Sequence, residues 1–383
     1  MKYFRILTPL EKIYPDRNRS SLMGFTIYLL LLIIYTPAMF ADENIIAPGI
    51  TYEKRGDMHV IFCNIGADGV SVRPAIAGCT ISDSLENVLD ITSRENAVVG
   101  INANYFGHRF NSSPIGEIKG ILVIDGELIS TISTINPWLN AGIGITKDRR
   151  VVAGRPVNYE ITISTDKERK YRNILVNPLE WEGYDYVMIY TSNAGLRVPS
   201  VEAPYIVIHP LKGRGLTAGE KSVFKVARIE EELPVISGDA CVLTGTGEGS
   251  KYLRENFKQG DEVSIDIEFD GVFRDIWQMV GGRLRMVLDG RNRLTQDHPN
   301  DILEEKMSAG RIDDKTLVLC CGTTTCYEMA EFLVKLGVTD AILLDGGGSA
   351  NMVVRGENIY GGDRKIADAL LIYSKEIDYE NNN

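Results

Sequence analysis

After residue 42 the chain is dominated by short apolar runs that alternate with polar turns, a pattern typical of β-strands. The runs HVIFCNIG and VSVRPAIAG predict two strands paired with each other. The dipeptide Asp125-Gly126 predicts a tight hairpin turn, and GIGITKDRRVVAG predicts a second hairpin. Further strands are predicted at AVVGINANYF, YVMIYTSN, APYIVIHP, KSVFKVARIEE, DEVSIDIEF and KTLVLCCG.

Helical spacing of apolar residues is sparse. It predicts a helix within residues 82–96, with Ser82 or Ser84 as its N-cap, and another within 248–257. A third, amphipathic helix is predicted within 324–338, ended by Gly337. Many strands with few helices indicate an α+β fold, with a mixed, mainly antiparallel β-sheet core and a few flanking helices.

The first 41 residues have a different character. Basic residues outnumber acidic ones up to Ser21, an uncharged apolar stretch runs over residues 21–41, and small residues stand at Ala38 and Ala41. This order is typical of a secretory signal, with an uncleaved membrane anchor in the inner membrane as the alternative. The expected organisation is therefore a signal or anchor at 1–41, a β-rich extension at 42–95 and a main domain at 96–377. A secreted or periplasmic location follows.

Composition narrows the classes of partner and cofactor. The 383 residues carry a formal net charge of -11 and a sequence pI of about 5.1, which argues against nucleic-acid binding. The six cysteines form no CxxC pair, and no HExxH motif occurs, so a zinc site is not expected. The cysteines of CCGTTTC are expected to pack as small buried hydrophobes. No cofactor is required, although Asp345 and nearby carboxylates could hold Ca²⁺ or Mg²⁺.

The sharpest motif is DGGGSANM at residues 345–352. Three glycines after an apolar strand allow the backbone to approach a ligand closely, and successive N–H groups there can bind an anion. The alternative is a hairpin that needs glycine for its geometry alone. The candidate residues of this motif are Asp345, Gly346, Gly347, Gly348, Ser349 and Asn351.

Three other segments could contribute to the same site. In INANYF, Asn102 and Asn104 alternate along a strand end, so both amides point to one face; strand-end turn chemistry is the alternative. Arg364, in GDRKIADA, could clamp a phosphate or could form an ordinary ion pair. Gly281 and Gly282 imply close backbone approach or a bulge, with Arg283 or Arg285 within reach of an anion.

Together these segments resemble the phosphodiester glycosidase family. The resemblance rests on LLDGGGSANMV, INANYF, MVGGRLRMVLDG and GGDRKIADALLIY, in this family's order and spacing, and it runs from about Ala97 to Tyr373. It implies hydrolysis of a sugar-1-phosphodiester at its glycosidic bond. Asp345 would then be the carboxylate near the anomeric carbon, with Glu117 as a second catalytic candidate. The loop glycines, Gly281, Gly282 and the polar side chains at 102, 104, 349, 351 and 364 would bind substrate.

The sequence also departs from the family. Where the family usually carries Pro-Arg-Thr, the chain reads EEKMSAGRID, so that Lys306 or Arg311 would have to replace the arginine. A family Asp-Gly-Arg reads Cys321-Gly322-Thr323 here. The expected function is therefore an exported hydrolase of sugar-1-phosphodiesters in envelope or extracellular glycans. The alternatives are a catalytically weak glycan-binding envelope protein linked to exopolysaccharide metabolism, and a glycosidase of unphosphorylated sugars.

Overall fold

The computed structural model describes residues 44–81, 85–108, 114–165, 169–195, 198–201, 204–211, 215–296 and 301–375. The predicted signal or anchor at 1–41 lies outside these residues. Within them, no helix is both long and apolar enough to cross a membrane.

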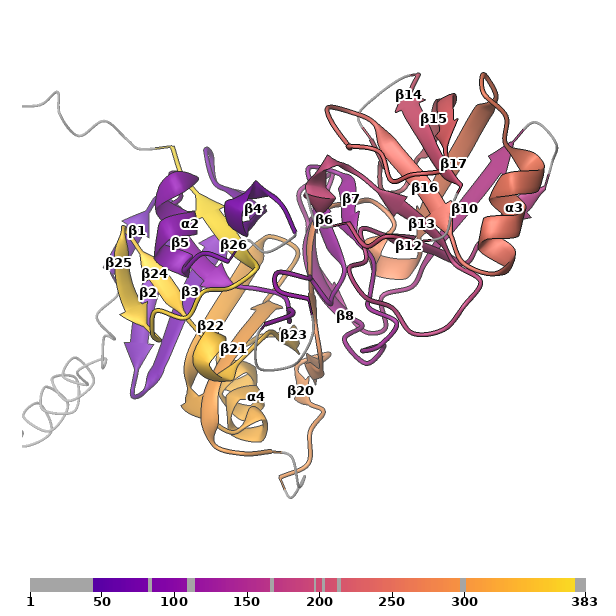
Figure 1. Ribbon diagram of the computed structural model, residues 1–383. Helices are drawn as coiled ribbons and strands as arrows, with labels where there is room; N and C mark the ends of the chain where they lie inside the picture. The colour runs from indigo at the N-terminus through magenta and orange to yellow at the C-terminus, as the bar shows by residue number, and fades with distance from the viewer. Residues whose placement is uncertain are drawn as a thin grey trace, which may run out of the picture. The chain divides into compact units, whose positions relative to one another are not determined.

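Four β-sheets make up the described chain (Figure 1), and every strand pair is antiparallel except β12 with β13. Sheet I has eight strands. Their order is β1 (Asn44–Ala47), β2 (Ile50–Arg55), β3 (Met58–Asn64), β22 (Thr316–Thr324), β21 (Glu304–Arg311), β23 (Asp340–Leu343), β19 (Arg285–Leu288) and β20 (Arg291–Asn292).

Sheet II also has eight strands. Their order is β11 (Lys170–Tyr171), β10 (Tyr159–Thr165), β17 (Glu262–Phe269), β15 (Lys221–Glu230), β14 (Tyr205–Pro210), β16 (Cys241–Gly245), β13 (Val187–Tyr190) and β12 (Ile174–Val176).

Sheets III and IV have five strands each. Sheet III is ordered β7 (Glu127–Ser130), β6 (Leu122–Ile124), β18 (Ile276–Gly282), β8 (Ala141–Thr146) and β9 (Val151–Gly154). Sheet IV is ordered β25 (Glu357–Tyr360), β24 (Met352–Val354), β5 (Val99–Asn102), β26 (Asp368–Tyr373) and β4 (Ser71–Ile76). The predicted α+β class with mainly antiparallel sheets is confirmed.

Three α-helices accompany the sheets in the described residues: α2 (Val88–Arg94), α3 (Glu248–Asn256) and α4 (Cys326–Lys335). Helix α4 begins with a capping box, in which the Thr325 side chain accepts from Glu328 N and the Glu328 carboxylate accepts from Thr325 N. It ends before Gly337, whose φ of 84° suits glycine. All three helices lie where the sequence predicts them.

One predicted strand pairing is wrong, and one predicted helix cap lies outside the described residues. The strands at HVIFCNIG and VSVRPAIAG do not pair: β3 lies between β2 and β22 in sheet I, and β4 pairs with β26 in sheet IV. The apolar pattern marks a buried strand but does not encode its partner. Helix α2 is capped by the Asn87 side chain, which accepts from Asp90 N; Ser82 and Ser84 lie outside the described residues.

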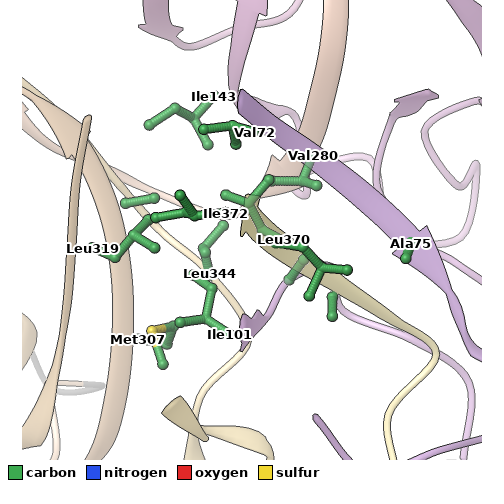
Figure 2. Packing of buried hydrophobic residues seen from close by; sticks show 14 of the residues in the cluster. Val72, Ala75, Ile101, Ile143, Val280, Met307, Leu319, Leu344, Leu370 and Ile372 are labelled. Carbon is green, nitrogen blue, oxygen red and sulfur yellow. The ribbon is translucent and has the colours of Figure 1, made fainter. Parts of the chain in front are cut away.

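One hydrophobic core joins sheets I, III and IV. Figure 2 shows Val72 of β4, Ile101 of β5, Val280 of β18 and Met307 of β21 packed in a single cluster. The central strands of sheet IV are buried throughout or nearly so, as Val99–Asn102 and the first five residues of β26 illustrate. This core fixes the ends of β5, β18, β23 and β26 relative to one another, and those ends carry most of the predicted site residues.

Candidate active site

The glycine loop, residues 345–351, links β23 of sheet I to β24 of sheet IV. At its start Asp345 N donates to Ala103 O at 3.2 Å, and at its end β24 pairs with β5, with Met352 opposite Ile101. The loop is therefore attached to the end of β5 at both of its ends. This geometry brings together two segments that are about 240 residues apart in the sequence.

Asn102 closes the connection between β5 and the glycine loop. Its Nδ2 donates to Asp345 O at 2.7 Å, and its Oδ1 accepts from Asn351 N at 3.1 Å. The side chain is 1% exposed. Both polar atoms of Asn102 therefore hold the loop in place, and Asn102 lies beneath the loop.

Asn104 forms a second buried brace. Its backbone N and its Nδ2 donate to the two carboxylate oxygens of Asp368, at 3.0 and 2.6 Å, and its Oδ1 accepts from Gly281 N at 2.9 Å. A Cβ at Gly281 would lie 2.6 Å from that Oδ1, which explains the glycine by close approach. Asp368 was not among the predicted site residues, although it lies in the quoted GDRKIADA segment.

Asp345 carries the carboxylate of the loop, and the residue is half-buried. Burial raises its pKa to about 7, although a hydrogen bond from Ser349, the charge of Arg364 and the Gly346 N–H oppose the rise. Asp368 is the second buried carboxyl nearby, and burial raises its pKa to about 6 against the hydrogen bonds from Asn104. An Asp345 side chain that titrates near neutral pH can exchange a proton during a reaction.

Arg364 lies over the glycine loop. Its Nη1 donates to Ser349 Oγ at 3.2 Å, and a Cβ placed at Gly348 would be 3.3 Å from its Cζ. Asn351 Nδ2 donates to Gly362 O and so holds the loop that carries this arginine. The arginine itself is exposed, so its guanidinium can reach a ligand above the loop.

The other candidate cations divide into two groups. Arg283 lies with Tyr105 beside Asp345: burial and the Asp345 charge raise the pKa of Tyr105, while a hydrogen bond with Arg283 opposes the rise. Arg285 and Arg311, by contrast, both pair with Asp340 at the opposite end of β23. Of the two arginines considered for anion binding at 283 and 285, Arg283 is the one that shares a neighbour, Tyr105, with Asp345.

Lys306, rather than Arg311, lies next to the glycine loop. It is 3% exposed and pairs with Glu304, and a Cβ at Gly346 would be 2.9 Å from the backbone oxygen of Glu305. Thr323, in the position of the family's second arginine, bonds to the Tyr360 hydroxyl at 3.2 Å. Of the two positions where the family resemblance leads us to expect an arginine, one therefore has a buried lysine beside the loop and the other has a neutral threonine.

Glu117 lies in a different environment. Its Oε1 accepts from the backbone N–H groups of Leu179 and Glu180, at 3.2 and 2.9 Å, and the residue is 3% exposed. Burial raises its pKa to about 8, and the adjacent Glu180 carboxyl, which pairs with Lys119, adds to the rise. Glu117 is therefore held in the segment that carries Leu179 and Glu180, and its hydrogen-bond partners within the described residues lie outside the glycine loop.

His108 connects the two regions electrostatically. Burial lowers its pKa, and the charges of Arg364 on one side and Lys119 on the other lower it further. The pKa of His108 is therefore influenced both by the arginine at the glycine loop and by the lysine that pairs with Glu180. No local pattern predicts this arrangement, because Arg364 is far from His108 and Lys119 in the sequence.

Metal binding is not indicated by the described geometry. Among the residues that the structure describes, no three His, Cys, Asp or Glu side chains are arranged to hold a metal ion. All six cysteines are free, and five of them are buried, including Cys320 and Cys321 in β22.

Comparison with known proteins finds a family model that matches part of the chain. Residues 218–373 match the model of the phosphodiester glycosidase family. This part of the chain therefore resembles the phosphodiester glycosidase family. The match contains the glycine loop, Arg364 and Gly281, and it ends at the residue where the sequence resemblance ends. Asn102, Asn104 and Glu117 precede the matched segment but share sheets or loops with it. No curated protein matches the sequence significantly.

Solved structures share the fold of this chain. A hypothetical protein from Synechocystis has a TM-score of 0.65 at 16% identity, over 85% of this chain and 62% of that chain. A protein from Burkholderia pseudomallei K96243, described as a candidate exported protein, has a TM-score of 0.64 at 18% identity, over 85% and 74%.

The catalytic domain of zebrafish N-acetylglucosamine-1-phosphodiester alpha-N-acetylglucosaminidase, auto-inhibited by its pro-peptide, gives a TM-score of 0.42 at 15% identity, over 88% and 82%. At these identities the first two similarities establish a common fold. The chain spans less than two thirds of the Synechocystis protein.

Proposed function

We propose that this protein is an exported hydrolase that cleaves the glycosidic bond of sugar-1-phosphodiesters, of the N-acetylglucosamine-1-phosphodiester type, in envelope or extracellular glycans. One observation carries the proposal: within the family domain, the Asp345 carboxylate and the Arg364 guanidinium flank a single glycine loop. A carboxylate for the anomeric carbon and a cation for the phosphate are the two groups that this reaction needs.

The reaction replaces one bond at the anomeric carbon. The oxygen of a water molecule bonds to C1, the bond from C1 to the phosphate oxygen breaks, and its electron pair remains on the phosphate. Asp345 in its ionised form accepts a proton from the attacking water. The products are the free sugar and a phosphomonoester, and the proton is released to solvent afterwards.

The leaving phosphate would be stabilised by groups at the loop. Arg364 offers a planar set of N–H donors, and the N–H groups of the glycine loop offer further donors that a side chain would block. Ser349 hydrogen-bonds to both Asp345 and Arg364, and so holds the carboxylate and the guanidinium close to each other. In this arrangement Asn102, Asn104, Asn351, Gly281 and Gly282 support the loop from below.

Export is part of the proposal. It rests on the basic, apolar and small-residue order of residues 1–41 and agrees with the description of the Burkholderia relative. N-terminal sequencing of the protein recovered from the periplasm and the medium would test it. A protein found only in the cytoplasm with residue 1 intact would refute export.

The activity is tested with residues 42–383 against UDP-N-acetylglucosamine, methyl N-acetylglucosamine-1-phosphate and 4-nitrophenyl N-acetylglucosaminide, in both anomeric forms. We expect release of free sugar from the phosphodiesters and a slower reaction with the aryl glycoside. Asp345→Asn should abolish hydrolysis while substrate binding, measured by calorimetry, persists. The exposed variant Asp289→Asn, in the β19–β20 turn, serves as the matched control.

A second candidate function is favoured by the substituted cations. Thr323 is neutral and Lys306 is buried against Glu304, so fewer donors are free for a leaving phosphate than in the family pattern. A catalytically weak glycan-binding envelope protein would follow. Wild-type protein that binds sugar phosphodiesters but releases no sugar from any of them would select this function over hydrolysis.

A further inference from the structure

A cavity whose lining residues lie outside the glycine loop is found between sheets III and IV. Its volume is about 700 Å³, within the range of small-ligand sites. The lining comes from β4, the end of α2, the β6–β7 hairpin and β18, with Asn193 and Thr217 from neighbouring loops. We call it the Trp277 groove. None of its described lining residues belongs to the glycine loop, to the end of β5 or to the Arg364 loop.

The floor of the Trp277 groove is apolar and rigid. Ala75, Ile124 and Ile129 lie in strands and are buried. At one side the six-membered ring of Trp277 lies directly on the β6–β7 turn, since a Cβ at Gly126 would be 2.4 Å from its Cζ3. Trp277 nevertheless remains 37% exposed. The groove therefore offers a fixed aromatic surface next to an apolar floor.

The wall of the groove is polar, and its side chains are already held in position. Asp125 accepts from Arg73 Nε and from Gln278 Nε2, both at 2.7 Å, while its own N–H donates to Gln278 Oε1 at 3.0 Å. Asn193 Nδ2 donates to Glu127 Oε1 at 3.2 Å. Side chains fixed in this way lose little conformational freedom when a ligand binds.

The charges of the groove select the class of ligand. Four carboxylates line it, at residues 95, 125, 127 and 220, against the two guanidinium groups of Arg73 and Arg94. A third cation, Lys147, pairs with Glu220 at 2.5 Å, and its Nζ lies over the Trp277 ring, 5.9 Å from the ring centroid. Arg73 pairs with Asp125 and Glu95, and Arg94 pairs with Glu86 and Glu95, so neither cation is free of carboxylates. Phosphates, nucleotides and acidic polymers would meet excess negative charge here.

A neutral sugar fits these surfaces. A pyranose ring has a face of C–H groups that packs on an aromatic ring and on aliphatic side chains, and its hydroxyls both donate and accept hydrogen bonds. We propose that the Trp277 groove binds a segment of a neutral oligosaccharide. The proposal does not depend on hydrolysis at the glycine loop, because the two sites share no lining residue.

The test uses the whole protein and a panel of neutral hexasaccharides: cello-, malto-, xylo-, manno- and chitohexaose, each at up to about 10 mM, with binding followed by saturation-transfer NMR and tryptophan fluorescence. We expect at least one of them to bind. Trp277→Ala should weaken that binding by at least about tenfold, and Glu127→Gln should weaken it less. The control Trp138→Ala removes another exposed tryptophan, 49% exposed and outside the groove, and should leave binding unchanged.

Three results would overturn the proposal. They are the absence of binding by every hexasaccharide of the panel, binding that Trp277→Ala leaves unchanged, and tighter binding of hyaluronan hexasaccharide, an acidic probe, than of every neutral one. Asp345→Asn should bind the neutral sugar as the wild type does, so a failure of the hydrolase proposal would leave this result intact.

Discussion

Replacing Glu117 with glutamine should make the protein more stable at alkaline pH. The Glu117 carboxyl is buried beside the Glu180 carboxyl, and the two can lie in contact only if a proton is shared between them. Glutamine is close to the same shape. Its Oε1 can accept from Leu179 N and Glu180 N as Glu117 does, and its Nε2 can donate to Glu180 in place of the shared proton.

The size of the effect follows from the pKa of Glu117, which folding raises from 4.5 to about 8. The folded protein therefore holds the proton more tightly than the unfolded chain does. The stability that this contributes is fully present below pH 4.5 and is lost as the pH rises through about 8. Each tenfold change in proton affinity is worth about 1.4 kcal/mol, so the wild type should lose up to about 4–5 kcal/mol relative to Glu117→Gln between pH 4 and pH 9.

Urea unfolding of wild type and variant, followed by tryptophan fluorescence at intervals from pH 4 to pH 9, measures this difference directly. Other titrating groups cancel because they are common to both proteins. Glu182→Gln is the matched control, since Glu182 lies in the same segment as Glu180 but is exposed. A difference between wild type and Glu117→Gln that stays constant with pH would mean that Glu117 is ionised in the folded protein, and the reasoning would be wrong.

Three further predictions concern the glycine loop. The kcat/KM for the phosphodiester should rise with pH to a plateau with a midpoint near 7, where Asp345 ionises, and Ser349→Ala should move that midpoint upward by removing a hydrogen bond to the carboxylate; a profile unchanged by the variant would contradict this. Arg364→Met should lower kcat/KM by at least about 100-fold, with partial recovery in Arg364→Lys, in steady-state assays; equal activities would exclude a phosphate contact. Asn102→Ala should cost about 2–4 kcal/mol in urea unfolding, because it leaves Asp345 O and Asn351 N without their partner; a loss below 1 kcal/mol would refute the bracing role.

Much of the fold could be predicted from local sequence signals. Asp125-Gly126 has φ values of 51° and 79°, as the predicted hairpin requires, and the Thr325 and Glu328 side chains form the capping box that starts α4. These features depend on residues within one turn of each other. The local pattern therefore contains the information needed to place them.

Contacts between distant segments could not be predicted in the same way. The partner of β4 is β26, almost 300 residues later, and Asp368 meets Asn104 across 264 residues. Glu117 offered no local sign that it would lie against Glu180, because the pairing depends on a loop 63 residues away. The periodicity of a single sequence reports the burial of a residue but not its neighbour, so these two pairs became visible only in the structure.

Burial decides how the predicted amides can act. Asn102 and Asn104 are 1% and 2% exposed, and their polar atoms already bond to protein groups. A sugar could bind to them only by displacing the glycine loop or Asp368, which would leave buried groups without partners. We therefore infer that the amides act through the loop, and that recognition falls to the groups that remain accessible: Asp345, Arg364 and the loop N–H groups. The paired amides that made INANYF conspicuous in the sequence thus contribute rigidity, which keeps a carboxylate and a cation at a fixed separation around one turn.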